Sequence, residues 1–127
     1  MLVVFDTNAL LLPFMQGTDL DGGLENLFGT VEWIIPSSIL GELKMLANGG
    51  EGTLARNAKA ALRLAQRARI ESTALPGDDG LLEVARRLKA AVVTNDRALQ
   101  AEAATSGLIV VVAREQGRLA LRRSASG

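Results

Sequence analysis

Short runs of apolar, often β-branched residues alternate along the chain with longer amphipathic segments. Residues 2–5, 91–93 and 108–112 are apolar at every position. Strands without polar alternation are buried on both faces, as in a parallel sheet that helices cover. The pattern therefore predicts strands at residues 2–5, 31–35, 70–73, 91–94 and 108–112.

The segments between these runs have the periodicity of helices. Apolar residues recur in them every three or four positions, which predicts helices at residues 9–15, 20–28, 37–47, 54–68, 80–89 and 97–105. The alternating residues 118–123 are compatible with a short edge strand or with a frayed helix. We expect an α/β fold: a three-layer α/β/α sandwich with a five-stranded, mainly parallel sheet, in a single domain over residues 1–127.

Composition restricts the chemistry that this domain can perform. The chain of 127 residues is 48% hydrophobic, which is enough for one core. It has no cysteine and no histidine, which excludes disulfides, thiolate zinc sites, cysteine nucleophiles and a histidine general base. An active site must be built from carboxylates, hydroxyls, amides and cations, and carboxylates suit hard ions such as Mg²⁺ or Mn²⁺.

The charges balance, with 14 basic and 14 acidic residues, so no overall field marks a polyanionic partner. The apolar N-terminal run ends at Asp6 without a basic leader and is too short for a signal peptide. No stretch reaches the roughly 18 uncharged apolar residues that span a membrane. We expect a cytoplasmic protein with no membrane segment.

Two aspartates follow predicted strands. Asp6 comes after residues 2–5, and Asp96 comes shortly after residues 91–94. Each position has a structural alternative, because Asp6, and either Asn95 or Asp96, could cap the helix that follows. The carboxyl ends of strands in an open α/β sheet are also where ligands bind, so a functional role is equally open.

Further acidic residues lie on predicted helices. Asp78 and Asp79 precede the helix at residues 80–89, where acidic side chains also favour the helix dipole. Glu42 falls about 40° from Leu46 around its helix, at the border of the apolar face. A carboxylate there is partly desolvated, which is costly unless a cation or hydrogen-bond donors satisfy it, although a glutamate at a helix edge can also reach water.

All these acidic positions meet at one edge of a parallel sheet. Clustered carboxylates repel one another and raise each other's pKa unless a divalent cation neutralises them. Asp6, Glu42, Asp79 and Asp96 therefore predict one metal site, with Asp78 as the alternative to Asp79. Oxygen ligands around such an ion suit hydrolysis of a phosphodiester, in which the ion activates water.

The sequence around these acids resembles the PIN-domain ribonuclease family. Residues 5–10 (Phe-Asp-Thr-Asn-Ala-Leu) match its first motif, and residues 39–43 (Ile-Leu-Gly-Glu-Leu) match its helical glutamate segment. Residues 78–82 (Asp-Asp-Gly-Leu-Leu) and 92–97 (Val-Val-Thr-Asn-Asp-Arg) match its last two acids. The likeness runs nearly end to end and indicates an archaeal-type member, either toxin-like or related to rRNA-processing nucleases.

The resemblance implies a five-stranded parallel sheet and Mg²⁺- or Mn²⁺-dependent cleavage of RNA by an endoribonuclease. The implied partners are RNA, a second copy of the chain, and either an antitoxin or a ribosome-assembly protein. A PIN fold that binds RNA or protein without cutting is the alternative function. The implied catalytic metal ligands are Asp6, Glu42, Asp79 and Asp96, with polar support from Asn8, Thr94 and Asn95.

Basic side chains that could contact phosphates lie beside the acids and on one helix. Arg97 comes directly after the last acid of the site. A basic stripe within about 80° around one predicted helix consists of Arg56, Lys59, Arg63 and Arg67. A track for the RNA backbone and an ordinary solvated face both explain this stripe. The arginines among residues 118–123 are further candidates, or simply part of a frayed terminus.

Overall fold

Six strands form one sheet in the part of the chain that the computed structural model describes, residues 1–123. They are β1 (Leu2–Phe5), β2 (Glu32–Pro36), β3 (Arg69–Glu71), β4 (Ala91–Val93), β5 (Val110–Ala113) and β6 (Leu119–Leu121). The order is β3-β2-β1-β4-β5-β6, with β3 to β5 parallel and β6 antiparallel to β5. The mainly parallel sheet is confirmed, whereas the predicted count of five strands is one too low. Residues 124–127 of the predicted domain lie outside the described part.

β1 lies inside the sheet, between β2 and β4. Its residues Val3, Val4 and Phe5 are fully buried, as expected for a strand that is apolar at every position. The ring of Phe5 lies 4.5 Å from the ring of Trp33 on β2, measured between centroids. The core is therefore continuous across the central strands, and the residue that follows β1 begins inside it.

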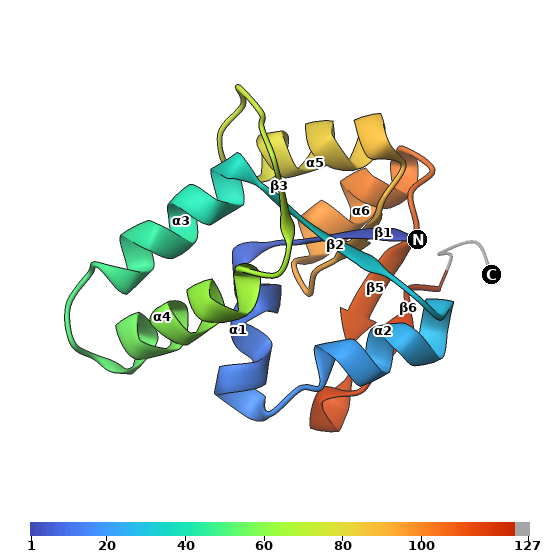
Figure 1. Cartoon of the computed structure of the whole chain (residues 1–127). Helices are drawn as coiled ribbons and strands as arrows, with labels where there is room; N and C mark the ends of the chain where they lie inside the picture. Colours follow the sequence, from blue (N-terminus) through green and yellow to red (C-terminus); the bar gives the residue numbers. More distant parts are fainter. Residues whose placement is uncertain (124–127) are drawn as a thin grey trace.

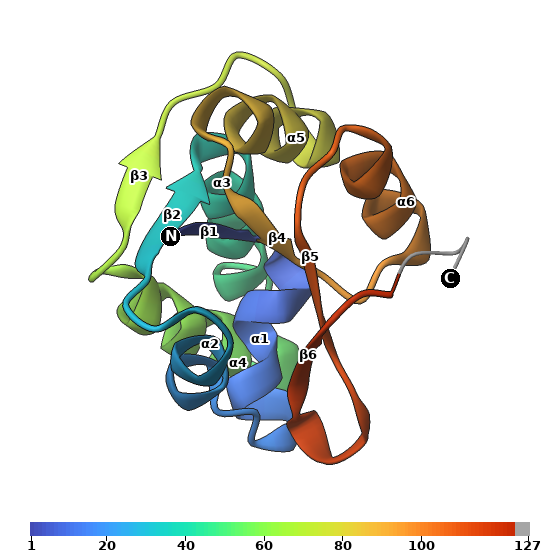
Figure 2. The same cartoon turned by 90° about the vertical axis from the view of Figure 1, so that its right-hand side faces the viewer.

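Helices cover both faces of this sheet (Figures 1 and 2). They are α1 (Thr7–Gln16), α2 (Leu20–Phe28), α3 (Ser37–Ala47), α4 (Thr53–Ala65), α5 (Gly77–Leu88) and α6 (Arg97–Thr105), with a short 3-10 turn, η1 (Glu115–Gly117). α5 and α6 lie on one side of the sheet, and α1, α2 and α4 lie on the other (Figure 2). This is the predicted three-layer sandwich. None of the helices within residues 1–123 has both the length and the apolar character of a membrane span.

Three helices, α2, α3 and α6, have the predicted bounds, and the others differ at their ends. α5 begins at Gly77, three residues earlier than predicted, so that Asp78 and Asp79 belong to its first turn. α3 and α4 pack side by side and extend beyond the carboxyl ends of the strands (Figure 1). The carboxyl edge of the sheet is therefore bordered by the starts of α1, α3, α5 and α6.

The alternating segment at residues 118–123 forms an edge strand, so the alternative of a frayed helix is wrong. β6 pairs with β5 and turns Leu119 toward α2, where this side chain is 7% exposed. A Cβ atom added at Gly23 of α2 would lie 2.7 Å from Leu119 Cδ1. A glycine at this position therefore allows α2 to pack closely on the leucine.

Truncation of Leu119 tests whether β6 is part of the core. Leu119→Ala is expected to lower the free energy of unfolding by about 2–5 kcal/mol, because the leucine is buried beneath α2. Leu121→Ala is the matched control, since Leu121 is 47% exposed on the same strand and its loss should cost far less. Urea unfolding of both variants measures the difference, and equal losses would contradict a structural role for β6.

Candidate active site

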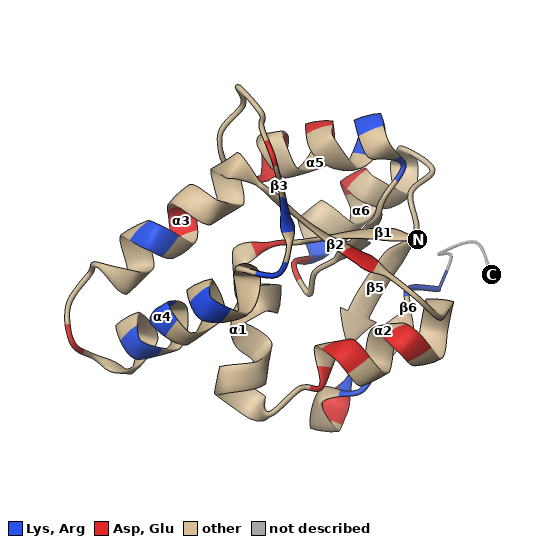
Figure 3. Ribbon diagram, in the orientation of Figure 1, with Lys and Arg blue, Asp and Glu red and all other residues tan. Residues whose placement is uncertain are grey.

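The carboxyl edge of the sheet gathers acidic side chains from four elements. Asp6 follows β1, Glu42 lies on α3, Asp78 lies in the first turn of α5, and Asp96 precedes α6. Acidic positions surround this edge in Figure 3. Asp6 is 6% exposed, Glu42 is half-buried, and Asp78 and Asp96 are exposed at the rim. The acids therefore form a buried floor with a solvent-facing rim.

Asp6 is held by two hydrogen bonds that come from different parts of the chain. Its Oδ1 accepts the backbone N–H of Ala9 at 2.7 Å, so Asp6 caps α1, as its structural alternative predicted. Its Oδ2 accepts a short hydrogen bond from the hydroxyl of Thr94. Thr94 Oγ1 in turn accepts the backbone N–H of Asp96 at 3.0 Å. The fully buried Thr94 thus links the residues that follow β1 and β4, which is a supporting role of the kind expected for it.

Asp96 caps α6 in the same way that Asp6 caps α1. Its Oδ1 accepts the backbone N–H of Leu99 at 3.0 Å, which settles the choice between Asn95 and Asp96 as the cap. An ionised carboxylate has about four lone-pair positions on its two oxygens. Capping is therefore compatible with a second role of these aspartates at the sheet edge.

The polar support around Glu42 comes from a residue that sequence reasoning missed. The hydroxyl of Thr7 donates to Glu42 Oε2 at 2.6 Å, which joins the start of α1 to α3. Asn8, which the family resemblance implied as a polar support of the site, is exposed on the first turn of α1. The only sequence signal for Thr7 is its place directly after Asp6, because a contact across 35 residues leaves no local pattern.

The acids act on one another electrostatically. Burial raises the pKa of Asp6, the bonds from Thr94 and Ala9 lower it, and the charges of Asp78 and Asp96 raise it. The pKa of Asp78 is raised first by burial and then by the charges of Asp96, Glu42, Glu102 and Asp79. The negative charges of these acids thus oppose the ionisation of Asp6 and Asp78, and a cation bound among them would offset this effect.

This coupling bears on the choice between Asp78 and Asp79. The charge of Asp78 acts on Asp6, and Asp78 feels Glu42 and Asp96, whereas Asp79 is not among the charges that shift Asp6. Both aspartates are exposed at the first turn of α5. The choice between Asp78 and Asp79, for which the sequence prefers Asp79, therefore stays open: both lie in the first turn of α5.

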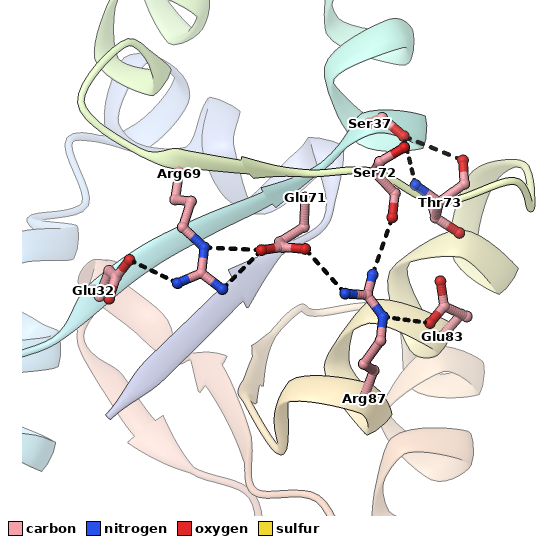
Figure 4. Close-up of polar contacts among 8 residues, drawn as sticks. All are labelled: Glu32, Ser37, Arg69, Glu71, Ser72, Thr73, Glu83 and Arg87. Carbon is pink, nitrogen blue, oxygen red and sulfur yellow. Dashed lines mark hydrogen bonds and ion pairs between the residues drawn. The ribbon is translucent and has the colours of Figure 1, made fainter.

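Two serines at the start of α3 hold the loop that carries Asp78. Ser37 Oγ accepts the backbone N–H of Thr73 at 3.0 Å and donates to its carbonyl oxygen at 3.3 Å (Figure 4). Ser38 Oγ donates to the carbonyl oxygen of Gly77 at 3.1 Å. A Cβ atom at Gly77, whose φ is +50°, would lie 3.4 Å from Glu42 Oε1. The start of α5 is thus fixed directly beside Glu42.

An ion-pair network holds the other end of the same loop. Arg87 on α5 donates to the carbonyl oxygen of Ser72 at 3.0 Å and pairs with Glu71 and Glu83 (Figure 4). Arg69 also pairs with Glu71, at 2.7 Å. The hydrogen bonds that Glu71 accepts from Arg87 and Arg69 lower its pKa. Although each exposed pair contributes little by itself, the network places β3 and its loop against α5.

Some of the basic side chains predicted to contact phosphates are exposed to solvent, whereas others form hydrogen bonds or ion pairs within the protein. Arg97 is exposed on the first turn of α6, beside Asp96. In the basic stripe, Arg56 donates to Glu51 O and Thr53 Oγ1 of its own helix start. Arg67 pairs with Asp21, and its guanidinium lies 4.1 Å from the centroid of the Trp33 ring. Arg67 therefore stabilises the packing of α2, while the exposed Lys59 and Arg63 point to solvent.

The donor set fits a hard metal ion by its chemistry, since it consists of carboxylate oxygens around a partly buried centre. Within residues 1–123, no three acidic side chains are arranged, as they stand, to hold one ion together. The buried Asp6 and half-buried Glu42 are fixed by hydrogen bonds, whereas Asp78 and Asp96 lie at the exposed rim. The rim side chains would therefore have to turn inward to complete a site.

The mainly parallel sheet, with helices on both faces and acidic side chains at its carboxyl edge, places the chain among the α/β proteins that bind ligands at the ends of their strands. Residues 3–116 match the model of a family described as the PIN-like domain. The chain therefore belongs to this family, which confirms the resemblance that the acid motifs indicated.

Individual relatives agree with the family. Ribonuclease VapC9 of Archaeoglobus fulgidus is 30% identical to this chain over 116 residues, which cover 91% of this chain and 85% of that protein. The structure of the PIN domain endonuclease Utp24 has a TM-score of 0.76 at 23% identity and covers 97% of this chain and 92% of that one. The crystal structure of VapBC2 from Rickettsia felis bound to a promoter DNA fragment has a TM-score of 0.63 at 18% identity. The match covers 88% of this chain and 98% of that one. At these identities the two structures show a shared fold.

Removal of the Thr94 hydroxyl tests the link between the two aspartates. Thr94→Val preserves the shape but leaves Asp6 Oδ2 without a donor and the Asp96 N–H without an acceptor, so we expect a loss of about 1–3 kcal/mol in unfolding free energy. Thr94→Ser retains the hydroxyl, so its unfolding free energy should fall clearly less than that of Thr94→Val. Urea denaturation at pH 7 compares the two, and a serine variant as unstable as the valine variant would contradict the role of the hydroxyl.

Proposed function

We propose that this protein is a metal-dependent endoribonuclease that hydrolyses RNA phosphodiester bonds at the carboxyl edge of its sheet. The observation that supports the proposal most is the placement of Asp6, Glu42, Asp78 and Asp96 by four elements at one edge of the sheet, with Asp6 6% exposed and fixed by hydrogen bonds. A protein gains nothing in stability from such a cluster unless a cation binds there. The 30% identity to a ribonuclease over 91% of the chain supports RNA as the substrate.

The proposed ion is Mg²⁺ or Mn²⁺, because the donors are oxygens. When bound, it would activate a water molecule and stabilise the charge that develops on the scissile phosphate. Asp6 and Glu42 would hold it from the floor of the site, with Asp96 and Asp78 turning in from the rim. Asp79 remains the alternative to Asp78.

Neighbouring groups would keep these ligands in place and position the substrate. Thr94 and Thr7 orient Asp6 and Glu42 through their hydroxyls. Arg97, on the first turn of α6, is placed to contact a phosphate beside Asp96. Lys59 and Arg63 of the basic stripe remain candidates for more distant phosphates, and Arg56 is a weaker one because it bonds to its own helix start.

Two biological contexts are compatible with this activity. The likeness to VapC9 supports a role as a toxin with an antitoxin partner, and the sequence resemblance to rRNA-processing nucleases supports work with a ribosome-assembly protein. Sequencing the RNA ends that form when the protein is expressed in cells separates these contexts, because processing gives defined rRNA ends. The alternative function, a PIN fold that binds RNA or protein without cutting, is decided by the cleavage experiment below.

Ion binding should stabilise the folded protein. We expect Mn²⁺ to raise the unfolding free energy by about 2.7 kcal/mol at an ion concentration one hundred times its Kd. Asp6→Asn should abolish most of this gain; its amide oxygen can still cap α1, but its amide nitrogen cannot accept the Thr94 hydroxyl, so the ion-free variant serves as its own baseline. Thermal unfolding of both proteins with and without Mn²⁺ is the measurement. Equal ion-induced shifts would exclude Asp6 from the site.

Cleavage separates the enzyme from the binding module. Asp96→Asn should still cap α6, yet it removes a negative charge from the proposed metal site, so hydrolysis of a labelled RNA should fall by orders of magnitude while RNA binding persists. EDTA should abolish wild-type cleavage, and added Mn²⁺ should restore it. The matched control is Glu25→Gln on α2, which removes a charge remote from the sheet edge. Wild-type protein that binds RNA but never cuts it with Mn²⁺ would favour the binding module.

A further inference from the structure

The hairpin that joins β5 to β6 carries arginines on an open hollow of about 1090 Å³ whose lining includes Arg114, Arg118 and Arg123. We propose that Arg114 and Arg118 bind the phosphate backbone of a single RNA strand as it leaves the candidate active site. This inference rests on the proposed function, and it assigns the substrate a path over the β5–β6 hairpin. Sequence reasoning had not included Arg114 among the phosphate contacts.

Arg114 and Arg118 lie directly opposite each other across the hairpin. The pairing of Ala113 with Leu119 sets this register, and the backbone N–H of Arg114 donates to the carbonyl oxygen of Arg118 at 2.7 Å. Side chains of such opposed residues leave the same face of a strand pair, and like charges in this position destabilise it. An anion between the two guanidinium groups would remove that cost, and a phosphate oxygen suits the guanidinium geometry.

These arginines also differ from the paired arginines elsewhere in the protein. Arg67, Arg69 and Arg87 each form an ion pair with a carboxylate. Within residues 1–123, no carboxylate oxygen lies within 4.0 Å of a guanidinium nitrogen of Arg114 or Arg118. The hollow is also lined by Glu115, so its three arginines face one carboxylate and it stays positive, although the whole chain has no net charge.

The hairpin is fixed to the catalytic edge by the side chain of Asn95. Its Oδ1 accepts the backbone N–H of Ala113 at 2.8 Å, and its Nδ2 donates to the carbonyl oxygen of Ala113 at 3.2 Å. Asn95 thereby ties the loop that carries Asp96 to the residue before Arg114. The polar support predicted for Asn95 is thus a bond to the hairpin, which makes the acids and the arginines parts of one continuous surface.

The tip of the hairpin is a defined turn that packs on the end of α1. Gln116 and Gly117 have φ values of +62° and +76°. A Cβ atom at Gly117 would lie 2.8 Å from Thr18 Oγ1, so the turn approaches Thr18 too closely for another residue. Thr18 is itself 4% exposed. This packing holds the two arginines on a rigid platform, which lowers the entropic cost of binding a flexible strand.

The test measures RNA binding without cleavage. A fluorescently labelled 20-nucleotide single-stranded RNA is titrated with protein that carries Asp96→Asn, at several NaCl concentrations. Adding Arg114→Gln and Arg118→Gln should weaken binding and reduce the slope of log K against log salt by about 1.4, since each phosphate contact contributes about 0.7 for single strands. The charge-retaining pair Arg114→Lys and Arg118→Lys should restore most of the slope.

The matched control is Arg86→Gln with Lys89→Gln, which removes the same charge at the end of α5, on the opposite edge of the sheet. A hairpin variant that binds with the affinity and slope of this control would overturn the proposal. A drop in slope that occurs instead with Lys59→Gln and Arg63→Gln would move the RNA path to α4 and also overturn it.

The design also separates this inference from the proposed function. If wild-type protein cuts RNA with Mn²⁺ while the hairpin variant keeps the full salt slope, only the path is wrong. If the hairpin variant loses slope while wild-type protein never cuts RNA, the arginines bind RNA and the nuclease proposal fails. Wild-type protein that binds no RNA at any salt concentration would contradict both.

Discussion

The hydrogen bond from Thr94 to Asp6 joins the ends of two adjacent strands, and the arrangement of the site depends on it. Burial raises the pKa of Asp6, while the hydrogen bonds from Thr94 and Ala9 lower it, so these two bonds offset part of the cost of placing a carboxylate in the core. The hydroxyl of Thr94 also accepts the backbone N–H of Asp96, so one side chain positions both aspartates. The start of α1 and the start of α6 therefore keep a fixed relation, and the remaining acids are arranged around them.

Much of the fold could be predicted because its signals are local. Residues 2–5 and 91–93 are apolar at every position, and they became β1 and β4, the central strands that place Asp6 and Asp96. β6 stayed undecided, because the burial of Leu119 depends on the close approach of Gly23, 96 positions away in the chain. Alternation alone cannot supply such a contact.

The sequence predicted that acids would lie at the carboxyl edge of the sheet, but not the contacts that position them. Consecutive helical residues point about 100° apart, so the choice between Asp78 and Asp79 depends on where α5 begins. That start is set by the hydrogen bond from Ser38 to Gly77 rather than by the amphipathic pattern. Arg67 was grouped with the basic stripe for a similar reason, since Trp33, which its guanidinium contacts, lies 34 positions earlier in the chain. The start of α5 and the position of Arg67 both depend on contacts between distant segments, which a local sequence pattern does not contain.

The network around Arg69 and Glu71 has a consequence for how the protein behaves at high concentration. β3 is an edge strand of three residues, and two of them carry charges that are engaged in ion pairs with Glu32 and Arg87. A short, charged edge is a poor template for another chain, because a strand added there would have to displace those pairs. The ion pairs that place the loop before Asp78 thus also oppose edge-to-edge aggregation of separate molecules.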